Sequence, residues 1–269
     1  MAPDPALTVP QLATLLGQWP PPTVVDVRRA AAFERDPVRI PGAIRRLPDE
    51  VATWSRTLEP WRAVVVYCVH GHEVSQDAAS ALRDTGLNAR YLTDGIEGWK
   101  ASGHAVEPVT APTHWVTRAR PKIDRIACPW LISRFIDADA VFHYVPPAEV
   151  RNFARAHGAI AYDVPDVDYT HVGERCSFDA FVARHDLRDP ALAALATIVR
   201  AADTGVPEQA APAAGLLAVS LGLSAMLEDD HAMLRWGLLT YDALFAWCRS
   251  RQDESHGWNP DVLRAAAQR

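Results

Sequence analysis

The chain has 269 residues, of which 49% are hydrophobic and 22% are charged, and its formal net charge at pH 7 is −6. This length favours two domains with cores of ordinary size. The acidic balance argues against a general nucleic-acid-binding surface and against an anionic-membrane-binding surface. We therefore expect no nucleic-acid partner and no membrane partner, while the composition leaves the oligomeric state open.

The four cysteines are far apart and form no CxxC pair; they are Cys68, Cys128, Cys176 and Cys248. This spacing disfavours a disulfide scaffold or a zinc ribbon and fits the reduced thiols of a cytosolic protein. The first residues, MAPDP, lack a basic segment followed by an apolar run, and no stretch of about 18 uninterrupted apolar residues is present. We therefore expect a cytoplasmic protein without a signal peptide or a membrane span.

Residues 1–108 alternate short apolar strands with helices. This alternation predicts a parallel sheet that helices cover on both faces. In chain order we expect a helix capped by Thr8 and stopped at Gly17, strands over 23–27, near 39–44 and over 64–67, a helix over 74–85, a strand over 89–92 and a short helix from 96.

Cys68 directly follows the apolar run Val64–Tyr67 and precedes the predicted helix over 74–85. It therefore lies at the carboxyl end of a strand, where reactive groups of parallel sheets gather. Loop amides and the amino end of the next helix favour a negative charge there, and such surroundings lower the pKa of a thiol. Cys68 is thus a candidate nucleophile, and the alternative is a buried structural cysteine.

Residues 104–113 are rich in proline and small residues and predict a linker. The pattern of predicted helices and strands changes after this segment. We place the first domain at 1–108, the linker at 109–113 and a mainly helical α+β domain at 114–269. In this second domain we expect strands over 114–117, 141–145 and 159–164, and helices over 124–137, 147–157, 177–186, 190–202 and about 225–250.

Four motifs make the first domain resemble the rhodanese-like sulfurtransferases: DVR at 26–28, RIPGAI at 39–44, the Cys68 loop and LTDGIEGW at 92–99. The resemblance implies a doubly wound parallel α/β sheet and a catalytic Cys68. This thiol would take sulfane sulfur from a small-molecule donor such as thiosulfate, hold it as a persulfide and pass it to a thiol or cyanide acceptor. The implied substrate-binding residues are Val69, His70, Gly71, His72, Glu73, Val74, Asp26 and Arg28.

The loop differs from that of the best-known thiosulfate-using relatives, which often place arginine or lysine beside the cysteine. Here two histidines and Glu73 follow Cys68, so we expect a weaker attraction for a dianion. Related phosphatases carry arginine six residues after the cysteine, and Val74 at that position argues against phosphatase chemistry. Asp26 and Arg28 are expected to form a polar pair behind the loop, either in direct contact with substrate or as a structural pair.

A basic segment stands out in the second domain, with four basic residues between positions 118 and 125. A proline fits best at the first helical position, so Pro129 would leave Cys128 as the N-cap, where nearby arginines would make its thiol acidic. The alternative is a solvated basic turn followed by an amphipathic helix with a buried cysteine. The candidate oxyanion-binding residues are Arg120, Lys122, Arg125 and Cys128.

An acidic segment over residues 163–179 combines several carboxylates with one imidazole and one thiol. Such a mixture can bind a divalent metal, with further carboxylates brought in by folding. The alternative is a solvated acidic loop. The candidate metal ligands are His171, Asp124, Asp203, Glu174 and Cys176, and a divalent metal is the one cofactor that the residues suggest.

Both segments, together with LLTYDAL at 238–244, resemble the C-terminal domain of the ChrB-type chromate-resistance family over about Trp115–Phe245. The resemblance implies resistance to chromate or sensing of chromate, a tetrahedral dianion. We therefore predict a cytoplasmic sulfurtransferase fused to a chromate-resistance domain. Two alternatives remain open: a protein without turnover that binds or senses an oxyanion or a redox state, and a metal-dependent chromate-handling domain at the C-terminus.

Overall fold

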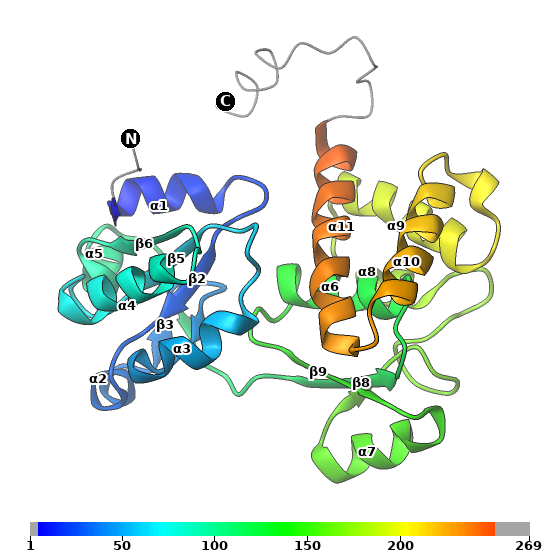
Figure 1. The fold of residues 1–269 in the computed structure, drawn as a ribbon, viewed down its shortest axis with the longest axis horizontal. Helices are drawn as coiled ribbons and strands as arrows, with labels where there is room; N and C mark the ends of the chain where they lie inside the picture. Colours follow the sequence, from blue (N-terminus) through cyan, green and yellow to red (C-terminus); the bar gives the residue numbers. More distant parts are fainter. Residues whose placement is uncertain (1–4, 251–269) are drawn as a thin grey trace.

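The computed structural model describes residues 5–250, which form two units joined by an extended segment (Figure 1). The first unit is built on a five-stranded sheet whose neighbouring strands are all parallel. Valine-rich strands suit a sheet that is buried on both faces. In spatial order the strands are β1 (Ala6–Leu7), β6 (Ala89–Leu92), β5 (Val64–Tyr67), β2 (Thr23–Asp26) and β4 (Ile44–Arg45).

Alternate residues of the central strands enter two separate cores. Val64 and Val66 pack with α3 and α4 on one face, whereas Val65 and Tyr67 pack with α1 and α5 on the other. This arrangement confirms the predicted parallel sheet with helices on both faces. The helices of this unit are α1 (Val9–Leu16), α2 (Ala30–Arg35), α3 (Val51–Trp54), α4 (Glu73–Asp84) and α5 (Gly95–Ala101), with 3-10 turns at Pro48–Glu50 and Ser55–Thr57.

The last residues assigned to the first domain pair with an earlier strand of the same unit. Strand β7 (Glu107–Pro108) pairs antiparallel with β3 (Val38–Arg39). The Arg39 Nε lies 2.8 Å from the Glu107 Oε1, so an ion pair fastens the two strands together. The chain therefore packs back onto the first unit before it enters the second.

The second unit has a three-stranded parallel sheet and a larger set of helices, which confirms the predicted α+β character. Its strands lie in the order β10 (Ile160–Ala161), β8 (His114–Arg118) and β9 (Val141–Val145). The helices are α6 (Asp124–Phe135), α7 (Val150–His157), α8 (Ser177–Arg184), α9 (Pro190–Asp203), α10 (Ala213–Met226) and α11 (Asp230–Ser250), with 3-10 turns at Pro147–Glu149 and Pro207–Gln209. Within residues 5–250 no helix combines the length and the apolar character needed to cross a bilayer.

Helix α6 begins at Asp124, so the prediction that Pro129 is its first residue is wrong. An internal proline removes one helical hydrogen bond, here the bond to the carbonyl of Arg125. The hydroxyls of Tyr144 and Tyr162 both donate to that carbonyl, at 3.4 Å. The sheet beneath α6 therefore supplies the partners that the proline takes away.

Helix α10 was not predicted as a separate element. Its sequence, AAGLLAVSLGLSAM, is apolar on every side and contains two glycines. It therefore lacks the amphipathic period on which helix prediction depends. The following helix α11 begins at Asp230, a few residues later than the predicted start near 225.

A buried charged network joins the two units. Arg134 of α6 lies 2.7 Å from Glu59 of the first unit and 2.9 Å from Asp242 of α11. The indole N–H groups of Trp61 and Trp130 donate to the same Asp242 carboxylate. Burial of an ion pair is tolerated when its hydrogen-bonding capacity is met in this way.

We predict that Asp242→Ala lowers the free energy of unfolding by about 3–5 kcal/mol, because it removes one of the two carboxylates that pair with the buried Arg134 guanidinium and the acceptor of two indole N–H groups. Urea-induced unfolding of the full chain measures this change. The control is Asp168→Ala, which removes a carboxylate whose side chain is 77% exposed and pairs with Arg184 on the surface. The control should cost less than about 1 kcal/mol, and an equally small cost for Asp242→Ala would contradict a joining role.

Candidate functional site

Cys68 lies at the carboxyl end of β5 and is 6% exposed. The Ser75 hydroxyl, in the first turn of α4, lies 3.3 Å from the Cys68 Sγ and 3.1 Å from the His72 carbonyl oxygen, and it can donate its one proton to either acceptor. The loop over 69–74 therefore begins directly after Cys68 and ends next to Ser75, whose hydroxyl lies beside the Cys68 sulfur. Ser75 was missed in the sequence analysis, although its place in the first turn after the loop was visible.

The backbone amides of loop residues 69–74 donate no hydrogen bond to any other group within residues 5–250. Amides in folded chains are nearly always paired, so a run of six free donors is unusual. The last of them belong to the amino end of α4, where free N–H groups and the helix dipole favour an anion. The loop thus offers unpaired N–H groups next to Cys68, and such groups can stabilise negative charge.

Two glycines allow this loop to pack closely against α5. At Gly71 (φ +73°) an added Cβ would lie 1.8 Å from the carbonyl oxygen of Thr93, and at Gly95 (φ +56°) it would lie 2.5 Å from that of Cys68. The amide of Ile96 also donates to the Cys68 carbonyl at 3.0 Å. The LTDGIEGW segment therefore fixes the position of the loop.

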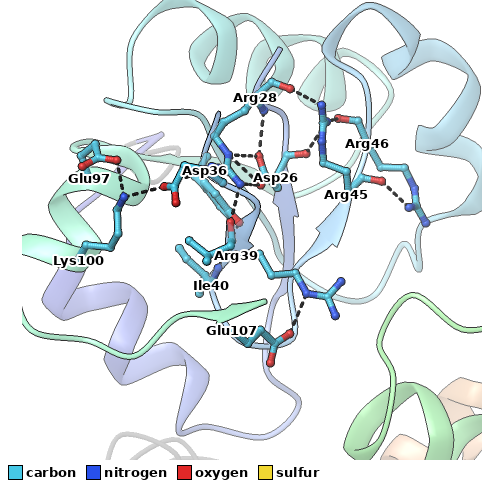
Figure 2. Close-up of polar contacts among 12 residues, drawn as sticks. Asp26, Arg28, Asp36, Arg39, Ile40, Arg45, Arg46, Glu97, Lys100 and Glu107 are labelled. Atoms are coloured by element: carbon cyan, nitrogen blue, oxygen red, sulfur yellow. Dashed lines mark hydrogen bonds and ion pairs between the residues drawn. The ribbon is translucent and has the colours of Figure 1, made fainter. Parts of the chain in front are cut away.

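Asp26 and Arg28 form a fully buried ion pair behind this edge of the sheet, as Figure 2 shows. The Arg28 Nε lies 3.0 Å from both carboxylate oxygens of Asp26. Its two terminal nitrogens donate to the carbonyls of Asp36 and Val38. The Arg28 guanidinium therefore uses its N–H donors on Asp26 and on backbone carbonyls. This favours a structural ion pair over direct contact of Arg28 with a substrate.

One basic side chain next to the loop was also missed. A cavity of about 240 Å³ is lined by Val74 of the loop and by Arg29, Asp49 and Asp77. Arg29 is exposed and directly follows Arg28 at the end of β2, and this position was the available signal. The two loop histidines are also exposed, so the electrostatic surroundings of the thiol are open to solvent.

A second cluster of functional side chains lies in the other unit. The His171 Nε2 lies 3.5 Å from Asp124, 3.4 Å from Asp163 and 3.2 Å from Asp203, measured to one carboxylate oxygen of each. Asp124 begins α6, Asp163 follows β10 and Asp203 ends α9. Folding thus brings together three of the predicted metal ligands, and it adds Asp163, which the predicted acidic segment contains but which was not named.

Two carboxylates of this cluster, Asp124 and Asp203, have pKa values above the usual range. Burial raises the pKa of Asp124, and burial together with the charges of Asp124 and Asp163 raises the pKa of Asp203 to about 7. The polar contact with Asp124 is the largest influence that raises the pKa of His171 to about 9. The negative charges of the carboxylates therefore favour a proton or another cation at this cluster.

The other two predicted metal ligands lie at the edge of this cluster or outside it. Glu174 is exposed and is not among the residues that converge on His171. Cys176 is buried, caps α8 and contacts Asp124. Burial raises the pKa of the Cys176 thiol.

The four predicted oxyanion-binding residues make separate contacts. Arg120 donates to the carbonyls at the carboxyl end of α10, and Arg125 pairs with Asp163 at 3.4 Å. Lys122 is half-buried. Cys128 is fully buried inside α6, where burial raises its pKa, so the predicted acidic thiol at an N-cap is wrong.

We predict that, in the presence of a chelator, the free energy of unfolding decreases as the pH rises from 6 to 9. The pKa of His171 is raised from its usual 6.5 to about 9, so its contribution is complete below pH 6.5 and is lost through pH 9. Asp203, raised from 3.8 to about 7, changes stability in the same direction. Solvent screens the 40% exposed His171, so the decrease is modest.

The His171→Gln variant should show a flatter stability profile over this range, measured by urea unfolding at several pH values. The matched control is His157→Gln on α7, an exposed histidine outside the cluster. A slope that His171→Gln and His157→Gln share with the unaltered protein would contradict the assignment.

Comparison with known proteins divides the chain in the same way as the structure. Residues 8–102 match the family model of the rhodanese-like domain, and residues 115–248 match that of the ChrB C-terminal domain. Protein ChrB of Cupriavidus metallidurans is 36% identical over 121 residues, which cover 45% of this chain and 36% of that protein. The aligned region thus spans about a third of the length of this relative.

Solved structures match part of the chain. A rhodanese-related protein from Thermoplasma volcanium is 26% identical with a TM-score of 0.33, and the match covers 38% of this chain and 95% of that one. A thiosulfate sulfurtransferase from Pseudomonas aeruginosa is 22% identical with a TM-score of 0.33, and the match covers 38% of this chain and 19% of that one.

Proposed function

Because the chain joins a rhodanese-like domain at residues 8–102 to a ChrB C-terminal domain at residues 115–248, we propose that it is a sulfurtransferase of chromate resistance whose nucleophile is Cys68. The observation that carries this proposal is the loop of six free amides whose two ends meet at the Cys68 sulfur. Donors that are already oriented stabilise an anion without the cost of reorganisation.

In the first half-reaction the Cys68 thiolate attacks the outer sulfur of a sulfane donor such as thiosulfate. A new S–S bond forms to Cys68, the S–S bond of the donor breaks, and sulfite leaves with the electron pair of that bond. The unpaired amides of the loop that follows Cys68 would stabilise the negative charge before and after this step. Arg29 lines a cavity with Val74 of the loop and with the carboxylates Asp49 and Asp77.

In the second half-reaction an acceptor thiolate or cyanide attacks the outer sulfur of the persulfide. The S–S bond to Cys68 breaks, and the departing Cys68 thiolate takes the electron pair. The Ser75 hydroxyl, 3.3 Å from the Cys68 Sγ, donates a hydrogen bond to this leaving thiolate. The chromate-resistance setting rests on the match of the second domain to the ChrB C-terminal domain.

We predict that Cys68→Ser reduces thiocyanate formation from thiosulfate and cyanide to the uncatalysed background, because the hydroxyl of serine is a poor nucleophile toward sulfur. Intact-protein mass spectrometry should show one added sulfur atom on the unaltered chain and none on the variant. The control is Cys248→Ser, which alters a buried cysteine of α11 and should leave the activity unchanged.

Full activity of the Cys68→Ser protein would refute the catalytic assignment. Failure of the unaltered chain to accept sulfur from several sulfane donors would instead support a binding or sensing role without turnover. The first result would show that Cys68 is not the nucleophile, and the second would show that the protein has no sulfurtransferase activity.

We predict that Ser75→Ala lowers kcat/KM by about 10- to 100-fold. A hydrogen bond to a charged group contributes about 1.5–3 kcal/mol, and each 1.36 kcal/mol on the barrier is about tenfold in rate. Steady-state kinetics with thiosulfate and cyanide measures the effect. The control Ser80→Ala alters an exposed serine of the same helix, and equal rates for the two variants would remove Ser75 from the site.

A further inference from the structure

We propose that His171, Asp124, Asp163 and Asp203 bind a divalent first-row metal ion in the ChrB C-terminal domain. This proposal does not depend on the chemistry of Cys68, which lies in the other domain. The ligand atoms of Asp124, Asp163 and His171 all lie within 4.8 Å of one another, and Asp203 approaches the same imidazole nitrogen.

The spacing of these atoms fits a metal ion better than it fits a network of hydrogen bonds. Charged N–H···O bonds are about 2.7–2.9 Å long, whereas the His171 Nε2 lies 3.2, 3.4 and 3.5 Å from three carboxylates. One imidazole N–H also serves only one acceptor well. Two ligands about 2.1 Å from a metal lie about 3.0–3.4 Å apart in octahedral or tetrahedral geometry.

The surrounding contacts hold the carboxylates in position before an ion arrives. Asp124 accepts hydrogen bonds from the amides of Ser177 and Phe178 at the start of α8, at 2.6 and 3.3 Å. Asp163 accepts from the Ser177 hydroxyl at 2.9 Å, and its other oxygen pairs with Arg118 at 2.8 Å. Such outer contacts orient metal ligands and raise affinity.

The charge balance of the cluster also favours a cation. The two nearby arginines, Arg118 and Arg125, both pair with Asp163. Within residues 5–250, Asp124 and Asp203 have no ion-pair partner other than His171. A carboxylate as deeply buried as Asp124, 1% exposed, is costly unless it is paired or coordinates a metal.

A buried hydroxyl lies on β8 one residue before Arg118, which pairs with Asp163. The Thr117 Oγ1 is buried and has no hydrogen-bond partner in the described part of the chain. Thr117 is in register with Tyr144, whose hydroxyl reaches the Arg125 carbonyl in the first turn of α6. Thr117 therefore lies on the face of β8 that α6 covers, the helix that begins at Asp124.

The ligand types select the class of ion. Carboxylates suit Mg²⁺, Ca²⁺ and Mn²⁺, whereas imidazole suits Zn²⁺, Fe²⁺ and other transition ions. One imidazole with three carboxylates therefore favours Mn²⁺, Fe²⁺ or Zn²⁺. The His171 side chain is 40% exposed, so the site is open on one side, where an oxygen ligand from solution can complete the coordination.

The test is metal binding by the full chain, prepared without an affinity tag and treated with a chelator. Titration with Mn²⁺ followed by electron paramagnetic resonance, and with Zn²⁺ followed by calorimetry, should give one site per chain. His171→Gln and Asp203→Asn should each weaken binding by at least about tenfold, since the loss of outer-sphere partners alone costs 10–100-fold. The control Asp168→Asn removes an exposed carboxylate outside the cluster and should bind as the unaltered chain does.

Three outcomes would overturn the proposal: no saturable binding, undiminished affinity in both cluster variants, or Mg²⁺ binding as tight as Mn²⁺ binding. Circular dichroism of each variant in chelator verifies that it is folded, and Asp203→Asn preserves the volume of a side chain at the rim of the cluster. Cys68→Ser should retain full metal affinity, so failure of the sulfurtransferase proposal and failure of this one are distinguishable.

Discussion

Burial of charge is the constraint on which both domains depend, because an ionised group in the interior must find its partner within the protein. Asp26 and Arg28 are two residues apart at the edge of the first sheet, and each is the ion-pair partner of the other. Arg134 meets it with carboxylates from both domains. In the cluster around His171, one imidazole faces three carboxylates, so the negative charge is only partly balanced. This imbalance distinguishes the cluster from a structural ion pair.

The two sites differ in how far the sequence could predict them. The Cys68 site is local: an apolar strand, a loop and a helix follow one another, so β5 was predicted to the residue and α4 to within one residue. The His171 site gathers residues that are up to 79 positions apart, from Asp124 to Asp203. The chemistry of metal ligands suggested three members of this set. That Asp163 joins the cluster and Glu174 does not depends on tertiary packing, which local sequence patterns do not reveal.

The errors of prediction have the same origin. A proline is read locally as the start of a helix, yet Pro129 lies inside α6 because two tyrosines from the sheet satisfy the exposed carbonyl of Arg125. A run of basic residues is read as an anion site, yet Arg120 is used to close the end of α10. In each case a contact distant in sequence overrides a preference that is correct for an isolated segment.

The ion pairs of Arg134 also connect the energetics of the two domains. Glu59 belongs to the first domain and Asp242 to the second, so separating the domains would leave a buried guanidinium without half of its partners. Unfolding of one domain is therefore coupled to that of the other. A ligand that binds only the folded form of one domain stabilises the whole cooperative unit by mass action. A ligand bound at either proposed site would thus stabilise the other domain as well, without contact between the two sites.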